Sequence, residues 1–338
     1  TAASLFTAAI LMWTRGVKYA PVLTTFLMCV LLANCEVVFG TENAGGIAVN
    51  LCVIAVWCFL QERFIAWGVV CLAMSLVIKP HDAGFVWLFF LLAGESYRKR
   101  AMQTLIVAVI LSLPSIVWVS HVSPHWIQEL HANLANFSAR GDLNDPGPTA
   151  VSGRTGNMII SLQAVFSVLW DEPSFYNPAT YLVCAPLFLL WARRVSRTRL
   201  SADGAWLAIA AVVPLTMLVT YHRTYDAKLI MLTVPACAML FAKGDRIAQW
   251  AFAFTTAGIF FSADIPLGMV LAFSGKLHLK PAGFIEKALF ILLYRPVPLL
   301  LLAMAAFYLW VFLRHAPKQS ASMGAETGGA IPDLPAQA

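Results

Sequence analysis

Two short polar segments lie between long apolar stretches and hold residue types that bind anions and transfer protons. Residues 79–82 are Lys-Pro-His-Asp, and residues 221–226 are Tyr-His-Arg-Thr-Tyr-Asp. Lysine and arginine bind phosphate, and an imidazole beside a carboxylate can act as an acid or a base. Charged side chains in apolar surroundings are costly unless they have partners or a solvated cavity. The two segments are therefore the first candidates for a functional site.

Each polar side chain in these segments has a chemical role that its type suggests. Lys79 and Arg223 are candidate phosphate-binding residues. If the second segment continues as a helix, His222 and Asp226 share one face, and Asp226 can orient the His222 imidazole. His222 and Asp226 are therefore the candidate catalytic residues. Further candidates for substrate binding are His81, Asp82 and Tyr225. The plainer interpretation is that Pro80 starts a helix next to a snorkelling lysine and that the tyrosines are interfacial.

Other polar residues supply weaker candidates. Glu42 and Asn43 precede an apolar stretch and are candidates for substrate binding, although Asn43 or Thr41 could simply cap the following helix. The stretch 121–156 begins with an amphipathic pattern, which predicts a helix lying on the outer leaflet, and ends in a loop that could close over a substrate. In that loop Arg140 or Arg154 could reach a phosphate, and Arg154 is our candidate substrate contact.

The sequence predicts neither a metal site nor a cofactor. Three histidines of the stretch 121–156 invite a metal interpretation, but Pro124 interrupts the helical spacing between the first two. The seven cysteines contain no CxxC pair and lie in or beside apolar stretches, as small buried residues do.

The composition is that of a membrane protein. Of the 338 residues, 60% are apolar and only 12% are charged, whereas soluble domains have about 25% charged residues. The net charge of +6 is spread among loops, with no basic block suited to nucleic acid. We therefore expect an all-α polytopic membrane protein, with membrane lipids around it and no nucleic-acid partner.

Apolar stretches predict about eleven membrane-spanning helices. They are 1–13, 19–39, 45–60, 64–78, 82–94, 101–120, 176–192, 203–220, 228–242, 247–262 and 297–313. The stretch 157–170 is apolar but short, and is predicted to be a re-entrant or interfacial helix. With that assignment, 14 of the 23 lysines and arginines fall on one side, which the positive-inside rule makes cytoplasmic. The polar segments then face the outside, residues 1–314 form one membrane domain, and 315–338 form a disordered cytoplasmic tail.

Taken in order, these motifs resemble the membrane glycosyltransferases of family 87, which are C-type enzymes. The family pattern Gly-Gln-x-Asn is similar to residues 40–43, with Thr41 in place of Gln. A helix ending in Lys-Pro is matched by residues 77–80, and a His-x-x-Tyr-Asp element by residues 222–226. The resemblance covers about residues 20–245, and no single motif in it is specific.

The resemblance implies a C-type helical bundle in the plasma membrane with its active site facing the periplasm or cell exterior. It implies an inverting hexosyl- or pentosyltransferase. A mannose or arabinofuranose unit would pass from a polyprenyl-phosphate donor to a lipid or glycan acceptor. The family's catalytic Asp would lie just after a first membrane helix, which we expect upstream of residue 1. The rival interpretations are a transporter or lipid flippase, and an O-antigen ligase-like enzyme.

Overall fold

The described part of the chain is helical. A computed structural model describes residues 1–35, 44–142, 144–148, 159–262, 269 and 282–315. The helices of the first half are α1 (Ala2–Gly16), α2 (Pro21–Leu32), α4 (Ala44–Leu60), α5 (Ile65–Ile78), α6 (Pro80–Leu92), α7 (Glu95–Val122) and α8 (Trp126–Phe137). Those of the second half are α10 (Leu162–Leu169), α11 (Pro173–Arg197), α12 (Ala202–Val219), the 3-10 helix η1 (Asp226–Thr233), α13 (Val234–Phe241), α14 (Arg246–Phe261), α16 (Phe284–Tyr294) and α17 (Pro296–His315).

Four of these helices are long and apolar enough to cross a membrane, namely α7, α11, α12 and α17. The shorter helices α2, α4, α5 and α6 are apolar as well. Each of the eleven predicted segments overlaps at least one helix, although α2 ends at Leu32 and residues 36–39 of the predicted segment 19–39 lie outside the described residues. The structure thus confirms the all-helical class and supports a membrane protein, while the number of spans stays a prediction.

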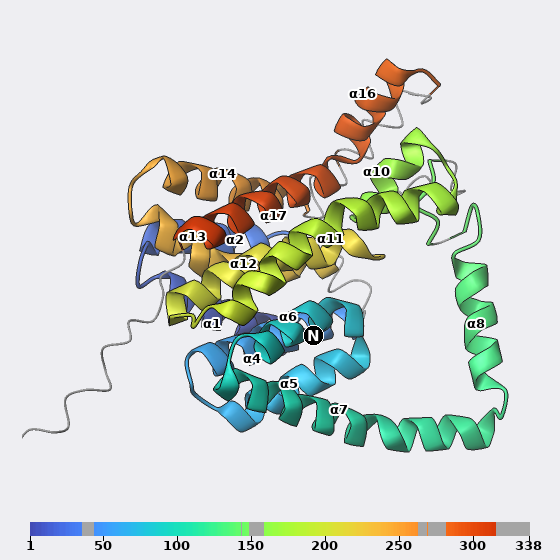
Figure 1. The fold of residues 1–338 in the computed structure, drawn as a ribbon, viewed down its shortest axis with the longest axis horizontal. Helices are drawn as coiled ribbons and strands as arrows, with labels where there is room; N and C mark the ends of the chain where they lie inside the picture. Colours follow the sequence, from blue (N-terminus) through green and yellow to red (C-terminus); the bar gives the residue numbers. More distant parts are fainter. Residues whose placement is uncertain (36–43, 143, 149–158, 263–268, 270–281, 316–338) are drawn as a thin grey trace, which may run out of the picture.

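The central element of the bundle is α12. Its side chains are buried from Gly204 to Leu218, and the helix packs against α17, α6, α11 and η1 (Figure 1). The indole of Trp191 in α11 donates a hydrogen bond of 2.9 Å to the carbonyl oxygen of Ala208. Because α12 is fixed on all sides, the segment that follows it begins from a defined position.

The hairpin of α4 and α5 is closely packed. Ser75 donates a hydrogen bond of 2.7 Å to the carbonyl oxygen of Ala48. At Gly68, an added Cβ would come within 2.7 Å of the Phe59 ring and 2.9 Å of the Cβ of Cys58. Only glycine allows the two helices to approach this closely, because any larger residue would push them apart.

We expect Gly68→Ala to lower the free energy of unfolding by about 1–3 kcal/mol, as overpacking does. Gly84 in α6 is the matched control, since an added Cβ there meets nothing within 4 Å. Gly84→Ala should be neutral or stabilising by up to about 1 kcal/mol, the helix-propensity difference. Thermal unfolding of both variants in the same detergent checks the pair, and equal effects would contradict the close packing at Gly68.

Residues predicted to share a side of the membrane do lie together. Arg15 at the end of α1 forms an ion pair of 2.7 Å with Asp203 at the start of α12. Arg100 in α7 lies 3.3 Å from Glu62, which follows α4. The basic end of α11 and Leu313 of α17 line one pocket. These contacts agree with the predicted grouping of the basic loops.

The structure departs from the prediction in two further segments. The predicted helix 228–242 is divided into η1 and α13, because Pro235 has no N–H to bond back to Met231. A helix that was not predicted, α16, lies within the expected outer stretch 263–296. Among the described residues of the predicted re-entrant or interfacial helix 157–170, Leu162–Leu169 form α10, whose eight residues extend about 12 Å and are too short to span a bilayer, as that prediction requires.

The predicted amphipathic helix exists as α8. It lies at the end of the molecule away from the C-terminus of α17 and runs crosswise to α7 and α11 (Figure 1). None of its side chains is buried, and its apolar residues Ile127, Leu130, Leu134 and Phe137 are exposed. This orientation and exposure fit a helix that lies on a membrane surface.

Candidate functional site

The first part of the site is the break between α5 and α6. Lys79 has an extended backbone (φ −152°, ψ 82°), because a residue before proline is disfavoured in the helical region. Pro80 then occupies the first position of α6 and starts the new helix. Lys79 therefore caps both helices: its N–H donates a 2.9 Å hydrogen bond to the carbonyl oxygen of Ser75, and its own carbonyl oxygen accepts one of 3.2 Å from the N–H of Asp82. His81 and Asp82 fall in the first turn of α6, where the helix dipole favours a carboxylate.

The second part of the site is the connection between α12 and η1. Its backbone is held by an antiparallel bridge between Arg223 and Ile159, and the N–H of Ile160 donates a 2.9 Å hydrogen bond to the carbonyl oxygen of His222. This segment is therefore not helical, and the prediction that His222 and Asp226 share a helix face is wrong. Asp226 instead begins η1 and accepts a 2.9 Å hydrogen bond from the N–H of Arg223.

Lys79 joins the two parts. Its ammonium donates a short hydrogen bond to Oδ1 of Asp226 and lies 3.5 Å from Oδ2 of Asp82. It also lies 4.8 Å from the centre of the Tyr225 ring, a cation–π distance. Both carboxylates are only 1% exposed. Burial at this level demands a partner, and Lys79 is shared between the two acids.

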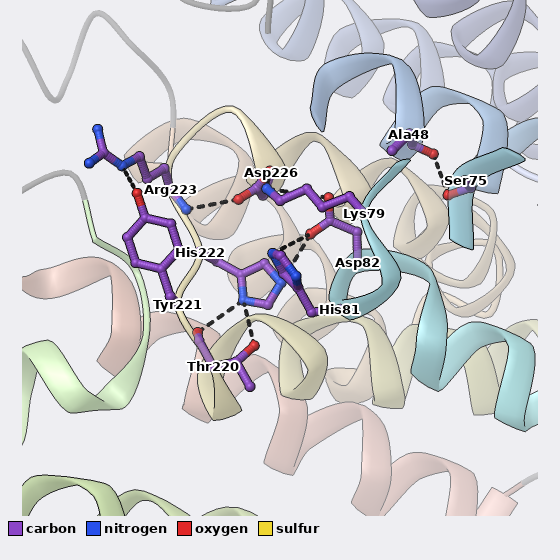
Figure 2. A network of polar contacts seen from close by, with 10 residues as sticks. All are labelled: Ala48, Ser75, Lys79, His81, Asp82, Thr220, Tyr221, His222, Arg223 and Asp226. Atoms are coloured by element: carbon purple, nitrogen blue, oxygen red, sulfur yellow. Dashed lines mark hydrogen bonds and ion pairs between the residues drawn. The ribbon is translucent and has the colours of Figure 1, made fainter. Parts of the chain in front are cut away.

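His222 is completely buried and is held from both sides. Its Nδ1 lies 3.0 Å from the carbonyl oxygen of Thr220, so Nδ1 carries the proton and donates it there. Its Nε2 lies 3.0 Å from Oδ1 of Asp82. The acid that contacts the imidazole is therefore Asp82, not Asp226 as predicted, because the extended segment turns His222 toward the start of α6 (Figure 2).

His81 completes the cluster. Its ring packs edge-on against that of His222, with centroids 4.9 Å apart, and its Nε2 lies 4.0 Å from Oδ1 of Asp82. With a side chain that is 36% exposed, His81 is more accessible than either acid or His222. It is the member of the cluster that an incoming ligand would meet first.

Arg223 does not join Lys79 as a second phosphate ligand in this arrangement. Its guanidinium group points away from Lys79 and donates a short hydrogen bond to the hydroxyl of Tyr221 (Figure 2). Burial raises the pKa of the Tyr221 hydroxyl, which stays neutral and can accept this bond. The predicted pairing of Lys79 and Arg223 on one phosphate therefore requires the arginine to move.

The other predicted residues are placed elsewhere or lie outside the described residues. Glu42, Asn43 and Arg154 fall outside them. Arg140 is exposed and forms ion pairs with Asp171 at 3.0 Å and Glu172 at 3.6 Å. The exposed histidines at 121, 125 and 131 are in or beside α7 and α8.

Two features of the site were not predicted. The carbonyl oxygen of Thr220 sets the tautomer of His222, and no sequence signal indicates this contact. Lys228, two residues beyond Asp226, is 4% exposed, and its ammonium donates a short hydrogen bond to the carbonyl oxygen of Asn34. A lysine within an apolar stretch was the available signal for the second feature.

The cluster can do three kinds of chemistry. It can move protons between carboxylates and imidazoles, hold a cation between them, or present an ammonium group to an anion. No protein-family model, curated protein or solved structure matches the chain.

Proposed function

We propose that the chain transfers a sugar from a polyprenyl-phosphate donor to a lipid or glycan acceptor at the outer face of the plasma membrane. The observation that carries the proposal is the direct contact between Lys79 of the Lys-Pro motif and Asp226 of the His-x-x-Tyr-Asp motif. The resemblance to family 87 implies that these two motifs belong to one active site. They are far apart in the sequence, and their contact is what a shared site requires.

Lys79 suits the stabilisation of a leaving phosphate. An ammonium group has three donors. Asp226 takes one, Asp82 lies within 3.5 Å of the group, and donor capacity remains for a phosphate oxygen. Because the two acids and the Tyr225 ring hold the lysine in place beforehand, little reorganisation is needed as negative charge develops. The lysine also sits at a helix break, where a lipid-linked phosphate would reach it from the membrane.

In the proposed reaction the acceptor hydroxyl oxygen attacks the anomeric carbon as the bond from that carbon to the phosphate oxygen breaks. The configuration inverts, and the electron pair leaves with the polyprenyl phosphate. The acceptor proton passes to a carboxylate base, which the resemblance places in the first outer loop. His222 contacts Asp82, whose other carboxylate oxygen lies 3.5 Å from the Lys79 ammonium, so the imidazole can exchange a proton with an acid next to the proposed phosphate site.

A proton-coupled transporter is the second candidate, and one observation favours it. Buried acid, lysine and histidine groups in contact are also the groups that relay protons in transporters. A transporter would move a solute without forming a new glycosidic bond. Product analysis therefore separates the two functions.

The test is a transfer assay with the full-length protein in proteoliposomes. Radiolabelled polyprenyl-phosphate-mannose and polyprenyl-phosphate-arabinofuranose are supplied with mixed lipid and glycan acceptors. We expect label in the acceptor and a loss of at least about 100-fold in His222→Ala, the size typical of lost acid–base catalysis. His131→Ala, an exposed histidine in α8, is the matched control and should transfer normally. Full transfer by His222→Ala would contradict the assigned site.

A further inference from the structure

We propose that His81, Asp82 and His222 bind a divalent transition-metal ion, with Zn²⁺ the best match. Each residue offers one ligand atom, and these three atoms lie within 4.8 Å of one another. They come from two separate parts of the chain, the first turn of α6 and the segment after α12. The sequence predicts no metal site, because His222 is far in sequence from the adjacent His81 and Asp82.

The geometry is close to that of a metal site. The Asp82 atom Oδ1 lies 3.0 Å from Nε2 of His222 and 4.0 Å from Nε2 of His81. Ligand atoms about 2.0–2.2 Å from a tetrahedral Zn²⁺ are roughly 3.3–3.6 Å apart. Side-chain rotation of the accessible His81 can supply the remaining adjustment. The other carboxylate oxygen of Asp82 faces Lys79, so a metal at Oδ1 lies on the far side of the carboxylate from the ammonium.

The ligand atoms lack hydrogen-bond partners. In the described part of the chain, Nε2 of His81, Nε2 of His222 and both carboxylate oxygens of Asp82 are buried without a hydrogen bond. Oδ2 of Asp82 lies 3.5 Å from the Lys79 ammonium, which leaves Oδ1 and the two imidazole nitrogens. Buried polar atoms in proteins are almost always bonded, so these three atoms at one place indicate a missing partner. Since all three can donate an electron pair, a cation satisfies them together.

The tautomer of His222 also indicates that the missing partner is a cation. Because Nδ1 of His222 donates to the carbonyl oxygen of Thr220, the neutral imidazole has a lone pair on Nε2. That lone pair faces a carboxylate oxygen at 3.0 Å, an arrangement that is repulsive unless a cation lies between them. A carbonyl bonded to the remote ring nitrogen is the usual support of a metal-binding histidine.

The net charge of the buried groups also favours a bound cation. The two buried carboxylates, Asp82 and Asp226, have Lys79 as their shared lysine partner, which leaves one negative charge without compensation if both histidines are neutral. A divalent ion changes this sum from −1 to +1. The resulting site would attract an anionic oxygen to the open coordination positions of the metal, and a phosphate oxygen meets that need if the proposed function holds.

Two imidazoles and one carboxylate favour Zn²⁺ and similar transition metals over Mg²⁺ and Ca²⁺, which prefer oxygen ligands. The test uses full-length protein purified with a tag that contains no histidine and stripped with a chelator. We expect Zn²⁺ to bind at one ion per chain, measured by dialysis and elemental analysis, and Mg²⁺ not to compete. Co²⁺ in its place should give the visible absorption bands of a low-coordinate site.

Two variants test the ligands. His81→Ala removes the accessible ligand and Asp82→Asn keeps the side-chain shape, and each should weaken Zn²⁺ binding by at least about 100-fold, since the loss of a mere supporting residue costs 10–100-fold. His131→Ala should bind as the unaltered chain does. Equal binding by the unaltered chain and a His81→Ala/His222→Ala double variant would overturn the proposal. The cation between His222 and Asp82 would then be a proton, and the sugar-transfer proposal, which is measured by label transfer, would stand or fall separately.

Discussion

Replacing Lys79 with methionine is expected to lower the free energy of unfolding by about 3–5 kcal/mol, the usual cost of breaking a buried ion pair. Lys79 is in contact with the carboxylates of Asp82 and Asp226, each 1% exposed. Methionine fills much of the space of the lysine but leaves both acids without their ammonium partner. The loss therefore comes from uncompensated charge, not from a cavity.

A second substitution separates charge from packing. In Lys79→Met/Asp226→Asn one of the two negative charges is removed together with the ammonium group, so most of the lost stability should return. The side-chain amide oxygen introduced at position 226 can still accept the 2.9 Å hydrogen bond from the N–H of Arg223. Unfolding by heat or SDS in one detergent measures all four members of the cycle. A double variant no more stable than Lys79→Met would contradict the shared-charge explanation.

The same variants distinguish a structural lysine from a functional one. If Lys79 also binds the donor phosphate, the double variant should fold well and yet remain without sugar transfer. If stability and transfer return together, Lys79 serves only to neutralise its two acids, and the proposed phosphate role is wrong. Lys79→Arg tests whether a positive charge alone is enough at this position, because it keeps the charge but changes the shape and reach of the cation.

The part of the site that local sequence rules govern could be predicted. Pro80 determines where α5 ends and α6 begins, and this is visible in the sequence. The apolar stretches on either side then bring Lys79 and Asp226 to the same end of the bundle, provided that the helices alternate in direction. Their contact confirms that grouping.

The choice of acid beside His222 could not be predicted. It depends on the extended conformation of the segment after α12, and that conformation depends on pairing with Ile159 and Ile160, which no local pattern encodes. A helical continuation would have presented Asp226 instead. In contrast, α16 was missed because its 11 residues are too few to span a bilayer and were assigned with the rest of 263–296 to the outer side. Tertiary contacts, not local propensity, decided the conformation around His222.

The buried arginine Arg295 holds the helix α10, which follows Ile159 and Ile160, and its replacement is the other change with a large expected effect. Arg295 lies between α16 and α17 and is 3% exposed. Its Nη1 donates a 2.5 Å hydrogen bond to the carbonyl oxygen of Pro146, and its Nη2 donates one of 3.1 Å to that of Gly147. Nη1 also bonds the carbonyl oxygen of Ala164 and the hydroxyl of Ser167, both in α10.

We expect Arg295→Met to lower the free energy of unfolding by about 2–4 kcal/mol, because charged hydrogen bonds are lost and the Gly147 carbonyl is left without its arginine partner. Burial lowers the pKa of Arg295 to about 10, which is still above neutral pH, so the unaltered residue is charged. The segment 144–148 should also become more sensitive to protease. Limited proteolysis followed by mass spectrometry locates the cuts, and thermal unfolding gives the stability.

The effect should reach His222 through the chain. Ile160, which is bonded to the backbone of His222, lies two residues before α10, and Arg295 fixes α10. We therefore expect Arg295→Met to lower sugar transfer although it contacts none of the site residues. Arg140→Met is the matched control for stability, since the Arg140 side chain is exposed and surface ion pairs such as the one with Asp171 contribute little. Equal losses of stability in the two variants would contradict the argument that burial makes Arg295 the more important arginine. If Arg295→Met is unstable but transfers sugar normally, α10 does not position His222.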